Sequence, residues 1–179
     1  MVREWIPVST SPKGRLALVA VKEFGARPFD EVTVAELAAA ANVTTGALYH
    51  HFGHKLGLYT FVRDDVERRL LDRMEGAVAA SGPESQRSAA VTSALLVGLD
   101  FAVREGFLRL LGSPPAGTEH DRLAEMLSVS AGPAAPVLGP VLAAAWRAAL
   151  AAVAEGAEPE QARAALAALR LHLPESAAV

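Results

Sequence analysis

Apolar residues recur at helical spacing along almost the whole chain, and Gly, Pro and Asn interrupt this pattern between the repeats. No stretch shows the alternation of β-branched residues that is typical of strands. Ser11-Pro12 is a typical helix start and Gly25 a typical stop, so we expect the first helix between them. The pattern places the other eight helices at residues 33–41, 44–52, 58–80, 84–104, 107–111, 119–129, 137–154 and 158–172, so the sequence predicts an all-α protein of about nine helices.

Two short helices separated by a tight turn lie at residues 33–52. Thr33 and Glu36 have the spacing of a capping box at the start of the first of them. Asn42 follows that helix, where a left-handed residue is favoured, and Thr44 is placed to cap the next helix. Leu48 points inward, which leaves a polar, slender N-terminus exposed on the second helix. This arrangement is typical of a helix-turn-helix, whose second helix enters the major groove of DNA.

The start of this second helix has the chemistry of a phosphate site. Thr44, Thr45 and Gly46 stand where free N–H groups and the positive end of the helix dipole favour an anion, and Gly46 allows close approach of the backbone. The alternative is that Thr44 only caps the helix. Within the whole segment we favour the interpretation as a DNA contact.

The segment from Thr33 to Leu58 resembles the DNA-binding segment of the tetracycline-repressor (TetR) family of bacterial regulators. The family pattern is T-x-x-x-[I/L]-A-x-x-A-G-V-[S/T]-x-G-x-[L/I]-Y-x-[H/Y]-F-x-[S/N/D]-K-x-x-L. The matching residues are Thr33, Leu37, Ala38, Ala41, Val43, Thr44, Gly46, Leu48, Tyr49, His51, Phe52, Lys55 and Leu58. Asn42 replaces the usual Gly, His54 replaces a helix-capping Ser, Asn or Asp, and Gly57 weakens the first turn of the next helix.

The resemblance implies which side chains face DNA. Thr45, Ala47 and Tyr49 are expected to face the groove, with Tyr49 and His50 touching backbone or base edges, and Ala47 is limited to apolar contact. Lys55 resembles the phosphate-contacting lysine of the family, the alternative being a solvated surface lysine. The hydroxyl of Thr33 is expected to cap its helix and to bind phosphate.

The same resemblance implies a two-part organisation. Residues 9–55 are expected to form a helix-turn-helix domain, and a long fourth helix joins it to a ligand-binding and dimerisation domain at 56–175. Residues 137–172 are rich in Ala, and the family places its homodimer interface in these two helices. On the pattern alone, an intramolecular core is the alternative. A dimer presents two recognition helices to successive major grooves.

If the family mechanism holds, a small and largely apolar effector enters among the fourth to seventh helices. Arg104 and His120, together with Thr92, are possible polar selectors, although each candidate is also an ordinary core residue. The remaining candidate lining residues are apolar: Met74, Leu99, Phe101, Phe107, Leu110, Met126 and Trp146.

Charge and composition narrow the function further. The net charge is −3, but residues 1–62 hold six Lys/Arg against five Asp/Glu, so the excess acid lies in the rest of the chain. Asp64, Asp65 and the arginines around them are interpreted as a solvated, salt-bridged helix face. The absence of cysteine suits a reducing compartment, so we expect a cytoplasmic protein, and Arg147 interrupts the longest apolar run, so we expect no membrane span.

No set of residues has the spacing of a catalytic or metal site. His50 and His54 stand one helical turn apart, but a zinc site needs three or four ligands, and His120-Asp121 has no nucleophile beside it. We therefore expect no enzyme activity, no cofactor and no metal. The sequence predicts a homodimeric regulator, most often a repressor in this family, that binds a palindromic DNA operator and is released by its effector. The alternatives are a helical interaction protein that has lost DNA binding and, third, an all-helical enzyme.

Overall fold

The structure is a computed structural model, and it describes residues 10–82, 87–115, 120–133, 137–169 and 171. These residues form nine α-helices, one short 3-10 helix and no strand, which confirms the predicted all-α fold. In chain order the elements are α1 Pro12–Ala26, η1 Phe29–Glu31, α2 Val34–Ala40, α3 Thr45–Phe52, α4 Lys55–Ala80, α5 Arg87–Glu105, α6 Leu108–Gly112, α7 Arg122–Ala131, α8 Leu138–Ala154 and α9 Pro159–Ala167.

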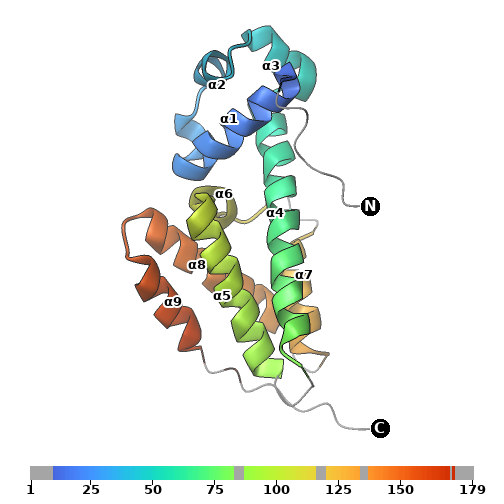
Figure 1. The fold of residues 1–179 in the computed structure, drawn as a ribbon, viewed down its shortest axis with the longest axis vertical. Coiled ribbons are helices and arrows are strands. Elements are labelled where there is room, and N and C mark those ends of the chain that lie inside the picture. Colours follow the sequence, from blue (N-terminus) through green and yellow to red (C-terminus); the bar gives the residue numbers. More distant parts are fainter. Residues whose placement is uncertain (1–9, 83–86, 116–119, 134–136, 170, 172–179) are drawn as a thin grey trace.

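Helices α1 to α3 form a small head, and α4 runs from this head down through the helices of the body (Figure 1). The head is held together by fully buried leucines from each of its helices and from α4: Leu16, Leu37, Leu48 and Leu58. The buried positions of α4 follow one another at steps of four: Leu58, Val62, Val66, Leu70 and Met74. These residues belong to one continuous hydrophobic core that extends from the head into the body, so α4 contributes to both parts.

The body is a bundle of α4 to α9 around a tightly packed core. Trp146 of α8 is fully buried, and its indole N–H donates to the carbonyl of Leu95 in α5 at 3.0 Å. A Cβ on Gly98 of α5 would lie 2.9 Å from the sulfur of Met74, so the lack of a side chain lets α5 approach α4 closely. These two contacts tie α5 to α8 and to α4.

The expected end of α1 was wrong in detail. Ser11 caps the helix by accepting from the N–H of Gly14, as expected, but the helix continues past Gly25 to Ala26. Gly25 is buried, and a Cβ there would lie 2.3 Å from the carbonyl oxygen of Gly106. Gly25 therefore lets the head lie against the body rather than ending its helix.

The expectation of a solvated charged face on α4 holds for Asp64, Arg68 and Arg73, which are exposed, but is wrong for three neighbouring charges. Arg63, Asp65 and Glu67 are 3%, 3% and 5% exposed. The guanidinium of Arg63 donates to the carbonyls of Leu110 and, at 2.7 Å, of Ser113, so it binds the C-terminal end of α6. Burial raises the pKa of Asp65 and of Glu67, although nearby arginines oppose this shift. The spacing of charges on α4 did not reveal that α6 and α7 cover it.

Asp121 and Arg147 form an ion pair between the start of α7 and the middle of α8. The two guanidinium nitrogens donate to the two carboxylate oxygens at 2.6 and 2.7 Å. Asp121 also caps α7 by accepting from the N–H of Ala124 at 3.1 Å. Burial opposes ionisation of this carboxyl, but the hydrogen bonds from Arg147 and Ala124 outweigh it and lower the pKa of Asp121. Asp121, for which the sequence indicated no catalytic role, is therefore a helix cap and an ion-pair partner.

Other helix boundaries also differ from the prediction; α4, for example, begins at Lys55 rather than at 58. α7 begins at Arg122 rather than at 119, because Asp121 takes the capping position. α9 ends at Ala167 rather than at 172, and residues 170 and 172 lie outside the described part. No helix among the described residues has the length and apolarity needed to cross a membrane.

Candidate nucleic-acid interface

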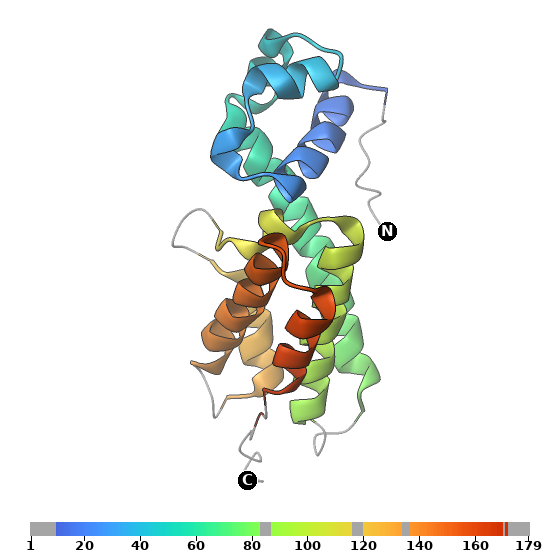
Figure 2. The same cartoon turned by 90° about the vertical axis from the view of Figure 1, so that its left-hand side faces the viewer.

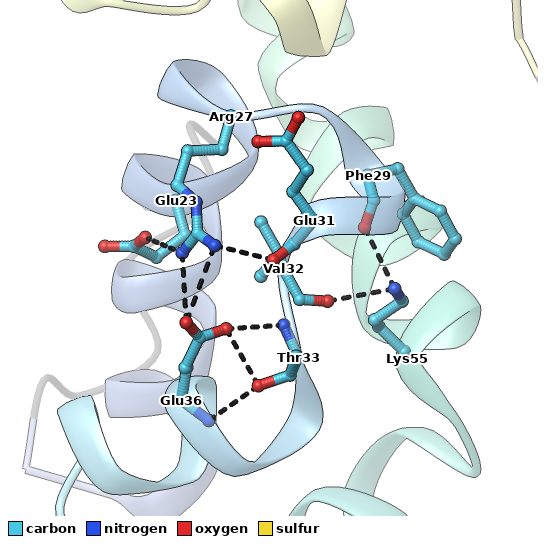
Figure 3. Close-up of polar contacts among 8 residues, drawn as sticks. All are labelled: Glu23, Arg27, Phe29, Glu31, Val32, Thr33, Glu36 and Lys55. Carbon is cyan, nitrogen blue, oxygen red and sulfur yellow. Dashed lines mark hydrogen bonds and ion pairs between the residues drawn. The ribbon is translucent and has the colours of Figure 1, made fainter.

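The capping box at the start of α2 is present as the sequence predicts. The N–H of Glu36 donates to the Thr33 hydroxyl at 3.2 Å, and the N–H of Thr33 donates to the Glu36 carboxylate at 2.8 Å (Figure 3). The hydrogen bond from the Thr33 backbone to the carboxylate, followed by the one from the Thr33 hydroxyl, lowers the pKa of Glu36. Arg27 also reaches this carboxylate, at 3.5 Å, and so ties the end of α1 to the start of α2.

The turn between α2 and α3 contains the left-handed residue that the sequence predicts. Asn42 has φ 51°, a conformation that Asn adopts at low cost. Arg15 of α1 holds this turn, because its guanidinium donates to the carbonyls of Ala41 at 2.9 Å and Asn42 at 3.3 Å. This role was not predictable from the sequence, because a single arginine on α1 is indistinguishable from a surface residue until the turn is placed beside it.

The predicted contact residues of α3 share one exposed side of the head. Thr44 caps the helix, its hydroxyl accepting from the N–H of Ala47 at 3.2 Å, while Leu48 is fully buried beneath. Exposed positions surround the helix start: Thr44, Thr45, Gly46, Tyr49 and His50. The Tyr49 ring is 53% exposed although it is a large hydrophobic group, and Ala47 is half-buried between these positions. The surface offers hydroxyls, free N–H groups and one aromatic ring.

Thr33 and Lys55 both have partners within the head. The Thr33 hydroxyl donates to the Glu36 carboxylate at 2.8 Å. The ammonium of Lys55 donates to the carbonyls of Phe29 and Val32, each at 2.9 Å, and lies 4.1 Å from the centre of the Phe29 ring (Figure 3). Lys55 is therefore a clamp between α4 and the connector at η1. Of its three N–H bonds, one is left for a phosphate.

Lys55→Met is expected to destabilise the protein by about 1–3 kcal/mol, because two carbonyls lose a charged donor while the side-chain volume is kept. Urea unfolding measures this loss. Lys22→Met on α1 removes an exposed lysine and is the control, expected within about 0.5 kcal/mol of wild type. If the two variants unfold alike, the clamp contributes nothing to stability.

The two departures from the family pattern at the start of α4 are compensated locally. His54 caps the helix, its ring Nδ1 accepting from the N–H of Gly57 at 2.8 Å. A Cβ on Gly57 would lie 2.1 Å from the carbonyl oxygen of Phe52, so this glycine lets the end of α3 lie against α4. Both residues therefore fix how the exposed helix is joined to the helix that runs into the body.

Comparison with known proteins agrees with this geometry. Residues 18–60, which span most of the head and the start of α4, match the family described as bacterial regulatory proteins, tetR family. The nucleoid occlusion factor SlmA of Shewanella woodyi is 34% identical over 97 residues, which cover 54% of this chain. Residues 18–60 therefore form a domain of the tetR family.

The similarity to solved TetR-family structures extends over the body as well. A TetR-family transcriptional regulator from Pectobacterium atrosepticum has the same fold, with a TM-score of 0.66 over 88% of this chain and 89% of that one, at 22% identity. By contrast, the match to SlmA spans 48% of that protein, about half its length. The family model therefore matches this chain in the head and the start of α4, whereas the match to the solved structure is one of fold and extends over the body.

The structure separates the predicted effector residues into two groups. Arg104 and His120 are exposed, so they do not join the others, and Thr92 is half-buried on α5. The apolar residues are all buried within the body core: Met74, Leu99, Phe101, Phe107, Leu110, Met126 and Trp146. They contact one another and the rest of the core, and Met126 also lines a hollow of about 390 Å³ between α4 and α7.

Proposed function

We propose that this protein is a TetR-family transcriptional regulator that binds a palindromic operator as a homodimer and is released by a small, largely apolar effector. The observation that carries the proposal is the exposure of the α3 N-terminus, with Thr44, Thr45, Gly46 and Tyr49 turned to solvent on a helix whose Leu48 is fully buried. A helix held this way is suited to the major groove. As a regulator of transcription, the protein is expected to act in the cytoplasm and to repress the genes next to its operator.

Each residue has a distinct task in this proposal. The N–H groups at Thr45 and Gly46 bind a phosphate at the positive end of α3. Tyr49 and His50 touch backbone or base edges, and Ala47 packs on a thymine methyl. Thr33 and Lys55 add phosphate contacts beyond their partners within the head. Since few cations take part, nonspecific binding is expected to be weak.

The exposed sides of α8 and α9 support a homodimer (Figure 2). The start of α9 exposes the acids Glu158 and Glu160. Apart from these acids, the exposed positions include Val137, Val141, Ala144, Ala148 and Ala152 along α8, and Gln161, Ala164, Ala165 and Ala168 along α9. None of these nine side chains carries a charge. Val137 and Val141 are 70% and 55% exposed, which is unusual for apolar side chains that remain in water. We call these nine residues the α8–α9 face, and we infer that a second copy covers it, forming a four-helix bundle.

The effector is proposed to act by opening the body core. The buried residues between α4 and α7 give an apolar lining, so a ligand among them must separate helices that now pack together. Such a ligand stabilises the conformation in which α4 has moved and thereby lowers operator affinity. A thermal-shift screen of apolar compounds tests this, because a ligand that binds the folded state raises the melting temperature.

A polarisation titration with duplexes selected from the DNA flanking the protein's own gene tests operator binding. The regulator is expected to bind one palindrome preferentially and to lose affinity as salt rises. Equal and weak binding to every sequence supports the alternative, a helical interaction protein that no longer reads DNA.

Tyr49→Ala is expected to weaken operator binding by about 1–3 kcal/mol while the fold is kept, because the ring is exposed and packs on nothing in the core. The titration described above measures the change. Leu56→Ala, which truncates a residue 45% exposed at the start of α4, is the control for a surface change on the head. Equal affinities of the two variants would remove Tyr49 from the interface.

A further inference from the structure

A cleft of about 380 Å³ lies where the head meets the body. Its head wall is aromatic: the rings of Phe24, Phe29 and Tyr59 lie 5.1–5.7 Å apart from centre to centre and pack edge-on or stacked. Its body wall is built by α6 and by the last turn of α8, with Leu108 and Ala154 among the apolar residues. The cleft is separate from the buried core between α4 and α7 in which we place the effector.

The charges around the cleft favour a cation. Asp30 and Glu155 line it, are exposed, and make no hydrogen bond or ion pair with another described residue through their side chains. The two lining arginines are engaged. Arg27 binds the carboxylates of Glu23 and Glu36 and the carbonyl of Glu31, as the dashed lines of Figure 3 mark.

The second arginine, Arg109, donates to the carbonyl of Ala154 at 3.0 Å, at the negative end of the α8 dipole. The four charged lining side chains cancel formally, but Arg27 is already matched by two further carboxylates. Lys55, whose ammonium lies on the ring of Phe29, is bound by two backbone carbonyls. The charged lining side chains without a partner among the described residues are therefore Asp30 and Glu155.

We propose that this cleft binds a small organic cation with an aromatic or apolar body. The ring of Tyr59 offers an aromatic surface to the cation, whereas Phe29 already stacks on Phe24 and takes the ammonium of Lys55 on its ring. Asp30 of the head and Glu155 of the body supply the counter-charge from opposite walls. The ligand therefore contacts both parts of the molecule at once.

The position of the cleft gives its occupancy a consequence for DNA. Next to it, the head is seated on the body without spare room, since Gly25 and the carbonyl of Gly106 approach closely. A ligand held between Asp30 and Glu155 stabilises one orientation of the head over others. This consequence rests on the proposed operator binding, whereas the ligand site itself does not.

Calorimetric titration with benzyltrimethylammonium tests the site, with phenylacetate and phenylacetamide as anionic and neutral comparisons. Wild type is expected to prefer the cation, and the double variant Asp30→Asn/Glu155→Gln to bind it at least about tenfold more weakly, a change of about 1.4 kcal/mol. The control Asp64→Asn/Asp72→Asn removes two exposed acids of α4 outside the cleft and is expected to bind as wild type does. Thermal unfolding confirms that both double variants are folded.

Three results would overturn the site: a preference for phenylacetate that is lost in Arg109→Met, equal binding of all three compounds, or equal weakening in both double variants. The coupling between cleft occupancy and DNA binding is measured separately, as the operator affinity with and without saturating benzyltrimethylammonium. A change in wild type that is absent from the cleft double variant supports it, and no change in wild type overturns it. A chain that binds no operator at all fails the proposed function while the calorimetric result for the cleft stands.

Discussion

Ala148→Arg is expected to convert the homodimer into monomers. Ala148 lies in the α8–α9 face, which the second copy covers in the proposed dimer. Two-fold symmetry would bring the new arginines of both copies into this apolar contact, where the face has no carboxylate to pair with them. Sedimentation measures the loss of the dimer. Affinity for the palindrome is expected to fall by about 100-fold or more, because the second head no longer binds as part of the same molecule.

The matched control is Ala79→Arg, which adds the same charge at an exposed position near the end of α4, outside the α8–α9 face. It is expected to remain dimeric and to keep its operator affinity. If Ala148→Arg remains dimeric too, the interface lies on another face. If wild type is itself a monomer that binds single half-sites, the proposed assembly is wrong.

Asp121→Asn is expected to destabilise the protein by about 3 kcal/mol, because it leaves the buried guanidinium of Arg147 without its counter-charge. Asparagine is as good a helix cap as aspartate, so the hydrogen bond to the N–H of Ala124 is kept and the variant isolates the charge. Urea unfolding at neutral pH measures the change. Asp64→Asn, an exposed acid on α4, is the control and is expected to cost little.

The pH dependence of this variant has a defined sign. The pKa of Asp121 is lowered in the folded state, so its contribution is fully present above the unfolded value of about 3.9. The contribution is lost as the pH falls through the lower, folded value. The stability difference between wild type and Asp121→Asn is therefore expected to be constant from about pH 5 to 8 and to shrink below about pH 4. A difference that is absent at neutral pH would mean that water, rather than Asp121, compensates Arg147.

The head was predictable from the sequence because its signals are local. A capping box, a left-handed Asn and a hydroxyl cap each require only residues three or four positions apart, and all three are present at Thr33, Asn42 and Thr44. The apolar stripe of α4 was predictable for the same reason, because apolar residues at every fourth position indicate a buried helix face whichever helix covers it.

The burial of charge on α4 was not predictable in the same way. Arg63 binds carbonyls nearly fifty positions along the chain, at the end of α6, and Asp121 binds Arg147 from another helix. Nothing within one turn of these residues distinguishes them from solvated ones. The predicted phosphate role of Lys55 met the same difficulty, because its carbonyl partners belong to the connector before α2. The predicted boundary between a DNA-binding domain ending at residue 55 and a second domain beginning at residue 56 stays a prediction, because α4 runs without a break from the head into the body.

The continuity of α4 has a geometric consequence for the spacing of paired heads. Its 26 residues span about 39 Å at 1.5 Å per residue. If α4 tilts by about 5° about its C-terminal end, its N-terminal end next to the head moves by about 3 Å, which is close to the rise of one base pair. In a two-fold assembly both copies of α4 tilt, so the gap between the two recognition surfaces changes by about two base-pair steps. A barely visible rearrangement at the base of the molecule is thus enough to put the two surfaces out of step with the double helix.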